Sequence, residues 1–283
     1  MAPLITPEDL HPLLGRDRVR VLDVRYRLDR PDGSDEHREG HLPGAVYVDL
    51  ESELSRHGRR DEGRHPLPST ADLQAAARRW GIDDGDTVVV YDDDRALGAS
   101  RAWWLLTRSG VSDVRVLDGG LRAWLWAGLP LESGSVEPPA GSVTLTPYAE
   151  PVLSIDDAAA LPGAGVLLDV RAAERYRGET EPIDPIAGHI PGAVNLPTGA
   201  YMDGDRFRDA GSLRALFASV GVEPGVAAAA YCGSGVTAAQ AVLAADRAGL
   251  DLRLYPGSWS QWSNTPGRPI ATGDAPAEVT GTV

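Results

Sequence analysis

The stretch VAAAAYCGSGVTAAQAVLAADRA, residues 226–248, indicates an α/β fold. Val226 to Tyr231 is a short apolar run typical of a buried strand, and Thr237 to Ala248 carries apolar residues at helical spacing. Cys232 therefore lies on the turn that joins a strand to a helix. In an open parallel sheet such turns lie at the carboxyl ends of the strands, where ligands bind.

Cys232 is the only cysteine in 283 residues and the first candidate for a catalytic group. Gly233 and Gly235 allow a tight turn whose successive N–H groups form an anion-binding nest. The N-terminus of the following helix adds its dipole, so both features favour a thiolate, the nucleophilic form of the side chain. The alternative is that Cys232 is a small buried apolar residue without a chemical role.

The chain also contains an internal repeat. Val21 to Arg25 (VLDVR) recurs as Leu167 to Arg171 (LLDVR), and Gly40 to Val46 (GHLPGAV) recurs as residues 188–194 (GHIPGAV). The matching motifs keep their order along the chain, but the number of positions between a motif and its second copy changes slightly. This indicates a duplication with insertions and deletions in the loops.

The register of the repeat distinguishes the two copies chemically. Tyr231-Cys232 of the second copy corresponds to Tyr91-Asp92 of the first, and Asp93 and Asp94 follow. Three aspartates would repel an anionic substrate, and the first copy has no sulfur nucleophile. The second copy is therefore the expected reaction centre.

Strands alternate with helices in both copies, which predicts parallel sheets flanked by helices on both faces. We expect an α/β fold of two domains, an N-terminal one over residues 1–133 without the cysteine and a C-terminal catalytic one over residues 151–283. Glycine, proline and serine cluster in a linker at 134–150, and residues 271–283 are expected to form a mobile tail. Three cap residues followed by acidic residues indicate helix starts: Thr6, Thr70 and Ser154.

Composition excludes several classes of function. The net charge is −14, which argues against nucleic acid and anionic membrane surfaces as partners. No apolar run is long enough to cross a bilayer and no signal peptide is evident, so a cytoplasmic location is expected. A single cysteine and histidines without ligand spacing predict neither a metal site nor a cofactor.

These motifs closely resemble the tandem-domain rhodanese family of sulfurtransferases. The resemblance covers nearly the whole chain and rests on LDVR at 22–25 and 168–171, GHLPGA at 40–45, GHIPGA at 188–193, DGGLRAW at 118–124 and GSWSQW at 257–262. Its most specific marker is the cysteine that begins the six-residue loop CGSGVT. The resemblance implies two domains, of which the second is catalytic.

The resemblance implies that Cys232 takes sulfur from a small-molecule donor as a persulfide and passes it to a thiol such as thioredoxin, a low-molecular-weight thiol, or cyanide. The loop resembles the 3-mercaptopyruvate type, because it contains no basic residue. Thiosulfate is the alternative donor, and a non-catalytic binding module is the alternative function. A phosphatase would need arginine at position 238, which is alanine.

The resemblance also assigns candidate site residues. Arg175 matches the substrate arginine and, with Arg171 and Trp259, would bind the donor. A further arginine of the family has no counterpart in the acidic and apolar segment 181–187. Asp23, Asp169, His41 and His189 are expected to tie loops to the sheets, and His41 is also a candidate partner of Ser234 from the first domain. The expected persulfide cradle consists of Gly233, Ser234, Gly235, Val236 and Thr237.

Overall fold

The computed structural model describes residues 2–148 and 152–276, which form two compact units. The first unit comprises Met1–Arg56, Leu67–Pro151 and Asp203–Phe207. The second comprises His57–Pro66, Val152–Met202 and Arg208–Val283. The sequence predicted a single boundary between the domains, in the linker. That prediction needs correction, because the short segment 57–66 lies within the first half of the chain but belongs to the second unit.

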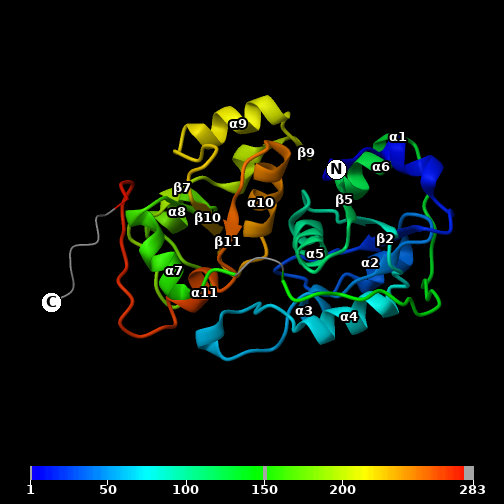
Figure 1. The fold of residues 1–283 in the computed structure, drawn as a ribbon, viewed down its shortest axis with the longest axis horizontal. Coiled ribbons are helices and arrows are strands. Elements are labelled where there is room, and N and C mark those ends of the chain that lie inside the picture. The colour runs from blue at the N-terminus through cyan, green and yellow to red at the C-terminus, as the bar shows by residue number, and fades with distance from the viewer. Residues whose placement is uncertain (1, 149–151, 277–283) are drawn as a thin grey trace. The chain divides into compact units, whose positions relative to one another are not determined.

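The first unit contains a five-stranded parallel sheet in the order β1-β5-β4-β2-β3. Figure 1 labels β2 and β5 of this sheet. Its central strand β4 reads TVVVY, and β-branched residues buried on both faces are typical of parallel sheets. Leu10 and Trp124 pack with Val89 and Tyr91 in the core on one face. The elements of this unit are β1 (Leu4–Ile5), α1 (Pro7–Leu10), η1 (His11–Leu13), β2 (Val19–Asp23), α2 (Ser34–Glu39), β3 (Val46–Tyr47), α3 (Leu50–Glu53), α4 (Thr70–Arg79), β4 (Thr87–Tyr91), α5 (Leu97–Arg108), β5 (Asp113–Leu117) and α6 (Gly120–Trp126).

The second unit contains a four-stranded parallel sheet in the order β11-β10-β6-β7. In Figure 1, α9 and α10 lie on one side of these strands and α7 and α11 on the other. Ala158 and Trp259 belong to the core of the α7 and α11 side. The elements are η2 (Arg60–Glu62), α7 (Ile155–Ala160), η3 (Leu161–Gly163), β6 (Val166–Asp169), α8 (Ala173–Tyr176), β7 (Val194–Asn195), η4 (Thr198–Tyr201), α9 (Ala210–Ala218), β10 (Ala228–Tyr231), α10 (Ala238–Arg247), β11 (Arg253–Leu254) and α11 (Ser258–Trp262). Two short strands, β8 (Met202–Asp203) and β9 (Arg206–Phe207), pair with each other.

The expected helix starts are close to the observed ones. Thr6 and Ser154 cap α1 and α7 and accept hydrogen bonds from the N–H groups of Asp9 and Asp157. The cap of α4 is Ser69 rather than Thr70, because the Ser69 hydroxyl accepts from the N–H of Asp72.

The expected linker is bound along the first unit where the structure describes it. Val143 is buried and its N–H donates to the carbonyl of Ile82, while Tyr148 donates its hydroxyl proton to the carbonyl of Pro68. The expected tail also starts later than residue 271, because Ala271 exchanges two backbone hydrogen bonds with His189. Residues 149–151 of the linker and 277–283 of the tail lie outside the described residues.

Candidate active site

Cys232 directly follows β10 at the carboxyl end of the second sheet. It is 2% exposed, and its sulfur accepts a hydrogen bond of 3.1 Å from the N–H of Gly235. Gly235 has a φ of 81°, and a Cβ atom there would collide with the carbonyl oxygen of Pro256. Only glycine therefore lets the loop close over the sulfur in this way.

Helix α11 holds the cysteine loop in place through hydrogen bonds. The carbonyl oxygens of Cys232 and Gly233 accept hydrogen bonds from the N–H groups of Trp259 and Ser260, at 3.0 and 2.8 Å. The N–H of Cys232 donates to the hydroxyl of Ser258 at 3.1 Å. The position of Cys232 thus depends on the first turn of α11.

Segment 57–66 is bound to the same helix. The N–H of Arg64 donates to the hydroxyl of Ser260 at 3.1 Å, and the side chain of Gln261 donates to the carbonyl of Asp61 at 3.1 Å. Gly63 packs so closely against Gly257 that a Cβ atom would lie 2.8 Å from the Gly257 carbonyl oxygen. These contacts place the side chains of the segment beside the cysteine loop.

His65 of this segment is hydrogen-bonded to Ser234, with 2.7 Å between His65 Nδ1 and Ser234 Oγ. Both residues are buried. The candidate partner of Ser234 from the sequence, His41, has another role in the first unit. Its Nδ1 lies 2.7 Å from the carbonyl oxygen of His37, and the two imidazole rings stack. The histidine that pairs with Ser234 is therefore His65.

Two arginines adjoin the backbone of Gly233. A Cβ atom at this position would lie 3.0 Å from Arg64 Nη2 and 3.7 Å from Arg175 Nη1. Arg175 donates from Nε and Nη2 to Glu181 at 3.2 and 2.6 Å. Asp184 forms an ion pair with Arg64 and lies 3.5 Å from Arg175 Nη2. Two side-chain cations thus lie beside a loop that has none of its own.

Arg171 is not available to a substrate in the way the resemblance implied. Its side chain is 2% exposed and donates to both oxygens of Asp169, to the carbonyl of Gly188 and to Glu181. Its guanidinium also lies over the Trp259 ring, 4.6 Å from the centroid. Arg171 therefore supports Glu181, and Trp259 supports Arg171 from a fully buried position.

The carboxylates balance the arginines of this cluster. Burial and the nearby Glu181 raise the pKa of Asp184, whereas Arg64 and Arg175 act against that shift. Burial also acts to raise the pKa of Glu181, but bonds from Arg175 and from backbone N–H groups leave it lowered. With its carboxyl groups ionised, the cluster pairs three guanidinium groups with three carboxylates and carries little net charge.

The residues shared by both copies tie turns to sheets. The Tyr91 hydroxyl donates to Asp23 and accepts from the N–H of Leu42, and the Tyr231 hydroxyl accepts from the N–H of Ile190 in the second copy. His189 Nδ1 bonds the carbonyl of Tyr176 at 2.8 Å. These contacts are consistent with the structural role expected for both pairs of aspartate and histidine.

In the first copy a carboxylate occupies the position of the sulfur. Asp92 accepts three hydrogen bonds, from the N–H groups of Asp94, Ala96 and Ala99 at 2.9 to 3.0 Å. Burial raises its pKa to about 7, and the three N–H groups act in the opposite direction. The loop of the first copy is thus an anion-binding nest that is occupied by the side chain of Asp92.

Sequence reasoning missed Arg64 and His65. Both lie in a strongly basic stretch, RHGRRDEGRH at 56–65, inside an acidic chain. That local charge contrast was the available signal. Their link to the second copy depends on contacts between residues more than a hundred positions apart, such as Arg64 with Asp184, which no local pattern reveals.

Comparison with known proteins agrees with this architecture. The rhodanese-like domain family matches residues 6–127 and 154–265. The fold and the cysteine loop thus define a two-domain rhodanese, and the chain belongs to the rhodanese-like family. No helix in the described residues is both long and apolar enough to cross a membrane.

Three similar proteins carry sulfurtransferase names. A Mycobacterium tuberculosis protein named "Putative thiosulfate sulfurtransferase SseB" is 49% identical over 277 residues, covering 96% of this chain and 98% of that protein. A Pseudomonas aeruginosa protein named "Probable 3-mercaptopyruvate sulfurtransferase" is 44% identical, covering 96% and 99%. The crystal structure of the 3-mercaptopyruvate sulfotransferase SseA from Escherichia coli is 31% identical with a TM-score of 0.82, covering 92% and 99%.

Proposed function

We propose that the protein transfers sulfur from 3-mercaptopyruvate to a thiol or cyanide acceptor through a persulfide on Cys232. The observation that carries the proposal is the geometry of the loop: the Cys232 sulfur accepts the N–H of Gly235, while Ser234 and its partner His65 stand in the same loop beside Arg175. A nucleophile, an anion nest, a proton-transferring pair and a carboxylate-binding cation are the groups that this reaction needs.

In the first half-reaction the Cys232 thiolate attacks the mercapto sulfur of the donor. The carbon–sulfur bond of the donor breaks, and its electron pair forms the enolate of pyruvate. The hydroxyl of Ser234, coupled to His65, stabilises the enolate oxygen and supplies a route for the proton that completes pyruvate. The N–H groups from Gly233 to Thr237 hold the resulting persulfide.

Charge supports 3-mercaptopyruvate over thiosulfate. Arg64 and Arg175 adjoin the loop, but Asp184 and Glu181 neutralise them, so the cluster favours a monoanion over a dianion. Arg175 presents Nη1 toward Gly233 while Glu181 holds the rest of its guanidinium. That free edge is the binding site we assign to the donor carboxylate.

Thiosulfate is the second candidate donor, because two guanidinium groups lie beside the loop and a relative is named for that substrate. Steady-state rates with each donor, with cyanide as the common acceptor, test the choice. We expect a higher kcat/KM with 3-mercaptopyruvate, and a higher value with thiosulfate would reverse the assignment. Because the reaction needs a free thiol, we place it in the reducing cytoplasm.

A non-catalytic role is tested independently. The purified protein, treated with donor and freed of its excess, should gain the mass of one sulfur atom. A chain that gains no mass with either donor would be a binding module rather than an enzyme.

A further inference from the structure

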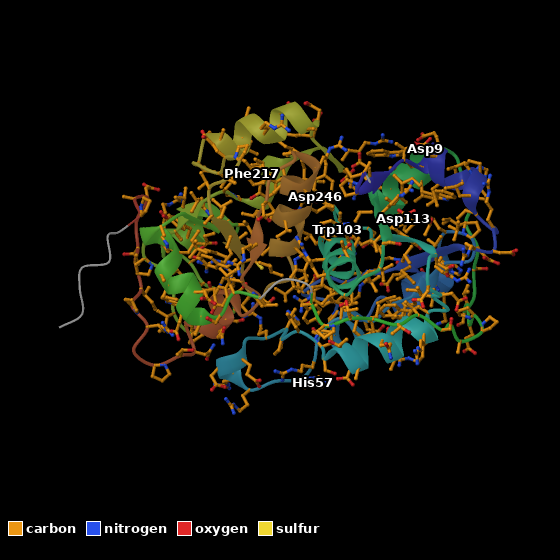
Figure 2. The ribbon with its side chains drawn as sticks, viewed as in Figure 1. Asp9, His57, Trp103, Asp113, Phe217 and Asp246 are labelled. Carbon is orange, nitrogen blue, oxygen red and sulfur yellow. The ribbon has the colours of Figure 1, made fainter. Side chains whose placement is uncertain are left out.

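A pocket of about 520 Å³ opens in the second unit beside segment 57–66. Arg59, Arg60 and Arg64 contribute to one wall and Ile183, Asp184 and Pro185 to another. Figure 2 labels His57, which lies on the same segment and also lines the pocket. The volume falls in the range of about 300–1,000 Å³ that is typical of small-molecule sites.

The pocket carries a local excess of positive charge in a chain of net charge −14. Arg59 is neutralised by Asp61, to which it donates two hydrogen bonds of 2.9 Å. Arg60 is exposed and has no side-chain hydrogen bond or ion pair among the described residues. A free guanidinium in such a chain attracts anions locally against the overall field.

Arg64 connects the pocket to the cysteine loop. One of its guanidinium nitrogens pairs with Asp184, and another lies against the backbone of Gly233. Its Nε is buried and finds no hydrogen-bond partner within residues 2–148 and 152–276. A buried donor without an acceptor is costly, so this group is available to an acceptor atom of a ligand.

We infer that this pocket binds the anionic part of the sulfur acceptor, a low-molecular-weight thiol that carries a carboxylate. The inference rests on the proposed persulfide chemistry. The donor is a three-carbon acid whose carboxylate is assigned to Arg175, and it does not need the further basic side chains on segment 57–66. The apolar wall formed by Ile183 and Pro185 suits the carbon skeleton of a larger molecule.

The second half-reaction then proceeds without any additional oxidant or reductant. The acceptor thiolate attacks the outer sulfur of the Cys232 persulfide. The sulfur–sulfur bond breaks, its electron pair returns to Cys232 Sγ as a thiolate, and the acceptor leaves as a persulfide that carries the proton of the outer sulfur. Binding of the acceptor carboxylate in the pocket orients its thiol for this attack.

The test compares acceptors that differ in charge. The protein is loaded with sulfur from 3-mercaptopyruvate, freed of the donor and mixed with 3-mercaptopropionate, 2-mercaptoethanol or cysteamine at one pH. The rate of persulfide loss is followed by mass spectrometry in rapidly quenched samples. Arg60→Glu is compared with Arg16→Glu, which makes the same change of charge at an exposed arginine of the first unit.

In Arg60→Glu we expect the ratio of the anionic to the neutral acceptor rate to fall about tenfold relative to wild type, since attraction becomes repulsion. The rate of persulfide loss with cysteamine should rise in Arg60→Glu. Arg16→Glu should keep the wild-type ratio of the anionic to the neutral acceptor rate, and added salt should lower that ratio in the wild type. Equal ratios in Arg60→Glu and wild type would overturn the inference while leaving the persulfide chemistry intact. A wild-type chain that takes up no sulfur would overturn both.

Discussion

His65 Nδ1 lies 2.7 Å from Ser234 Oγ, although 169 positions separate the two residues in the chain. The contact makes the loop that bears Cys232 dependent on a side chain from the first half of the sequence. It joins an imidazole, which can accept or donate a proton, to a hydroxyl two residues from Cys232. The proton transfer that we propose therefore depends on the same contact that holds the loop.

The first prediction concerns this pair. His65→Ala should lower kcat of persulfide formation by about a hundred- to ten-thousandfold, the range typical of losing a general acid or base. Ser234→Ala should act in the same direction, and the double variant should lose little more than the worse single variant because the pair acts as one unit. The control is His11→Ala, an exposed histidine of the first unit. Fully additive losses would contradict the coupling.

The second prediction concerns the nucleophile. Cys232→Ser should fold normally but transfer no sulfur, since the hydroxyl is a much weaker nucleophile than a thiolate. The measurement is the gain of one sulfur mass after incubation with donor. Asp92→Cys, which places a cysteine at the corresponding turn of the first copy, should add no second active centre. Turnover by Cys232→Ser would disprove the whole mechanism.

The third prediction concerns Arg175. Arg175→Ala should raise KM for 3-mercaptopyruvate by about ten- to a hundredfold, the value of a charged hydrogen bond of ~1.5–3 kcal/mol. Release of sulfur from a persulfide that has already formed should change much less, because the acceptor is assigned to other residues. Separate single-turnover measurements of each half-reaction distinguish the two effects. Equal losses in both would remove the donor carboxylate from Arg175.

The fourth prediction concerns Asp184. Asp184→Asn removes a buried carboxylate, so Arg64 and Arg175 are left with an excess of positive charge beside Gly233. A dianion should gain most, and the ratio of kcat/KM for thiosulfate to that for 3-mercaptopyruvate should rise about tenfold. Glu179→Gln is the matched control, since Glu179 is an exposed acid that pairs with Arg177. An unchanged ratio would show that charge balance does not select the donor.

The fifth prediction concerns pH and Asp92, whose pKa burial raises to about 7. Between about pH 4 and pH 7 the folded chain keeps a proton that the unfolded chain releases. The free energy of unfolding should therefore fall as the pH rises through this window, by up to about 4 kcal/mol, and change little above it. Denaturant titrations of wild type and Asp92→Asn at pH 5 and pH 8 measure the difference. The variant should show the smaller pH dependence, and identical slopes would contradict the assignment.

The sequence predicted what depends on local patterns. Cys232 lies at the end of a strand before a helix because apolar spacing and the two glycines determine that arrangement. The parallel sheets follow from the alternation of strands and helices in each copy. Arg64 and His65 could not be predicted, because their roles depend on α11 binding segment 57–66, and neither strand nor helix periodicity encodes such a contact. The ion pair between Arg171 and Asp169 could not be predicted either, because the sequence does not distinguish a paired arginine from an unpaired one.

The assignment of segment 57–66 to the second unit affects how this protein can be divided. A fragment that begins at the linker would keep the cysteine and its loop, yet it would lack the histidine that bonds Ser234 and one of the two guanidinium groups beside Gly233. The duplicated halves are therefore not interchangeable modules. The first half of the chain supplies part of the candidate site of the second, so removing or exchanging that half would change the side chains around the cysteine loop.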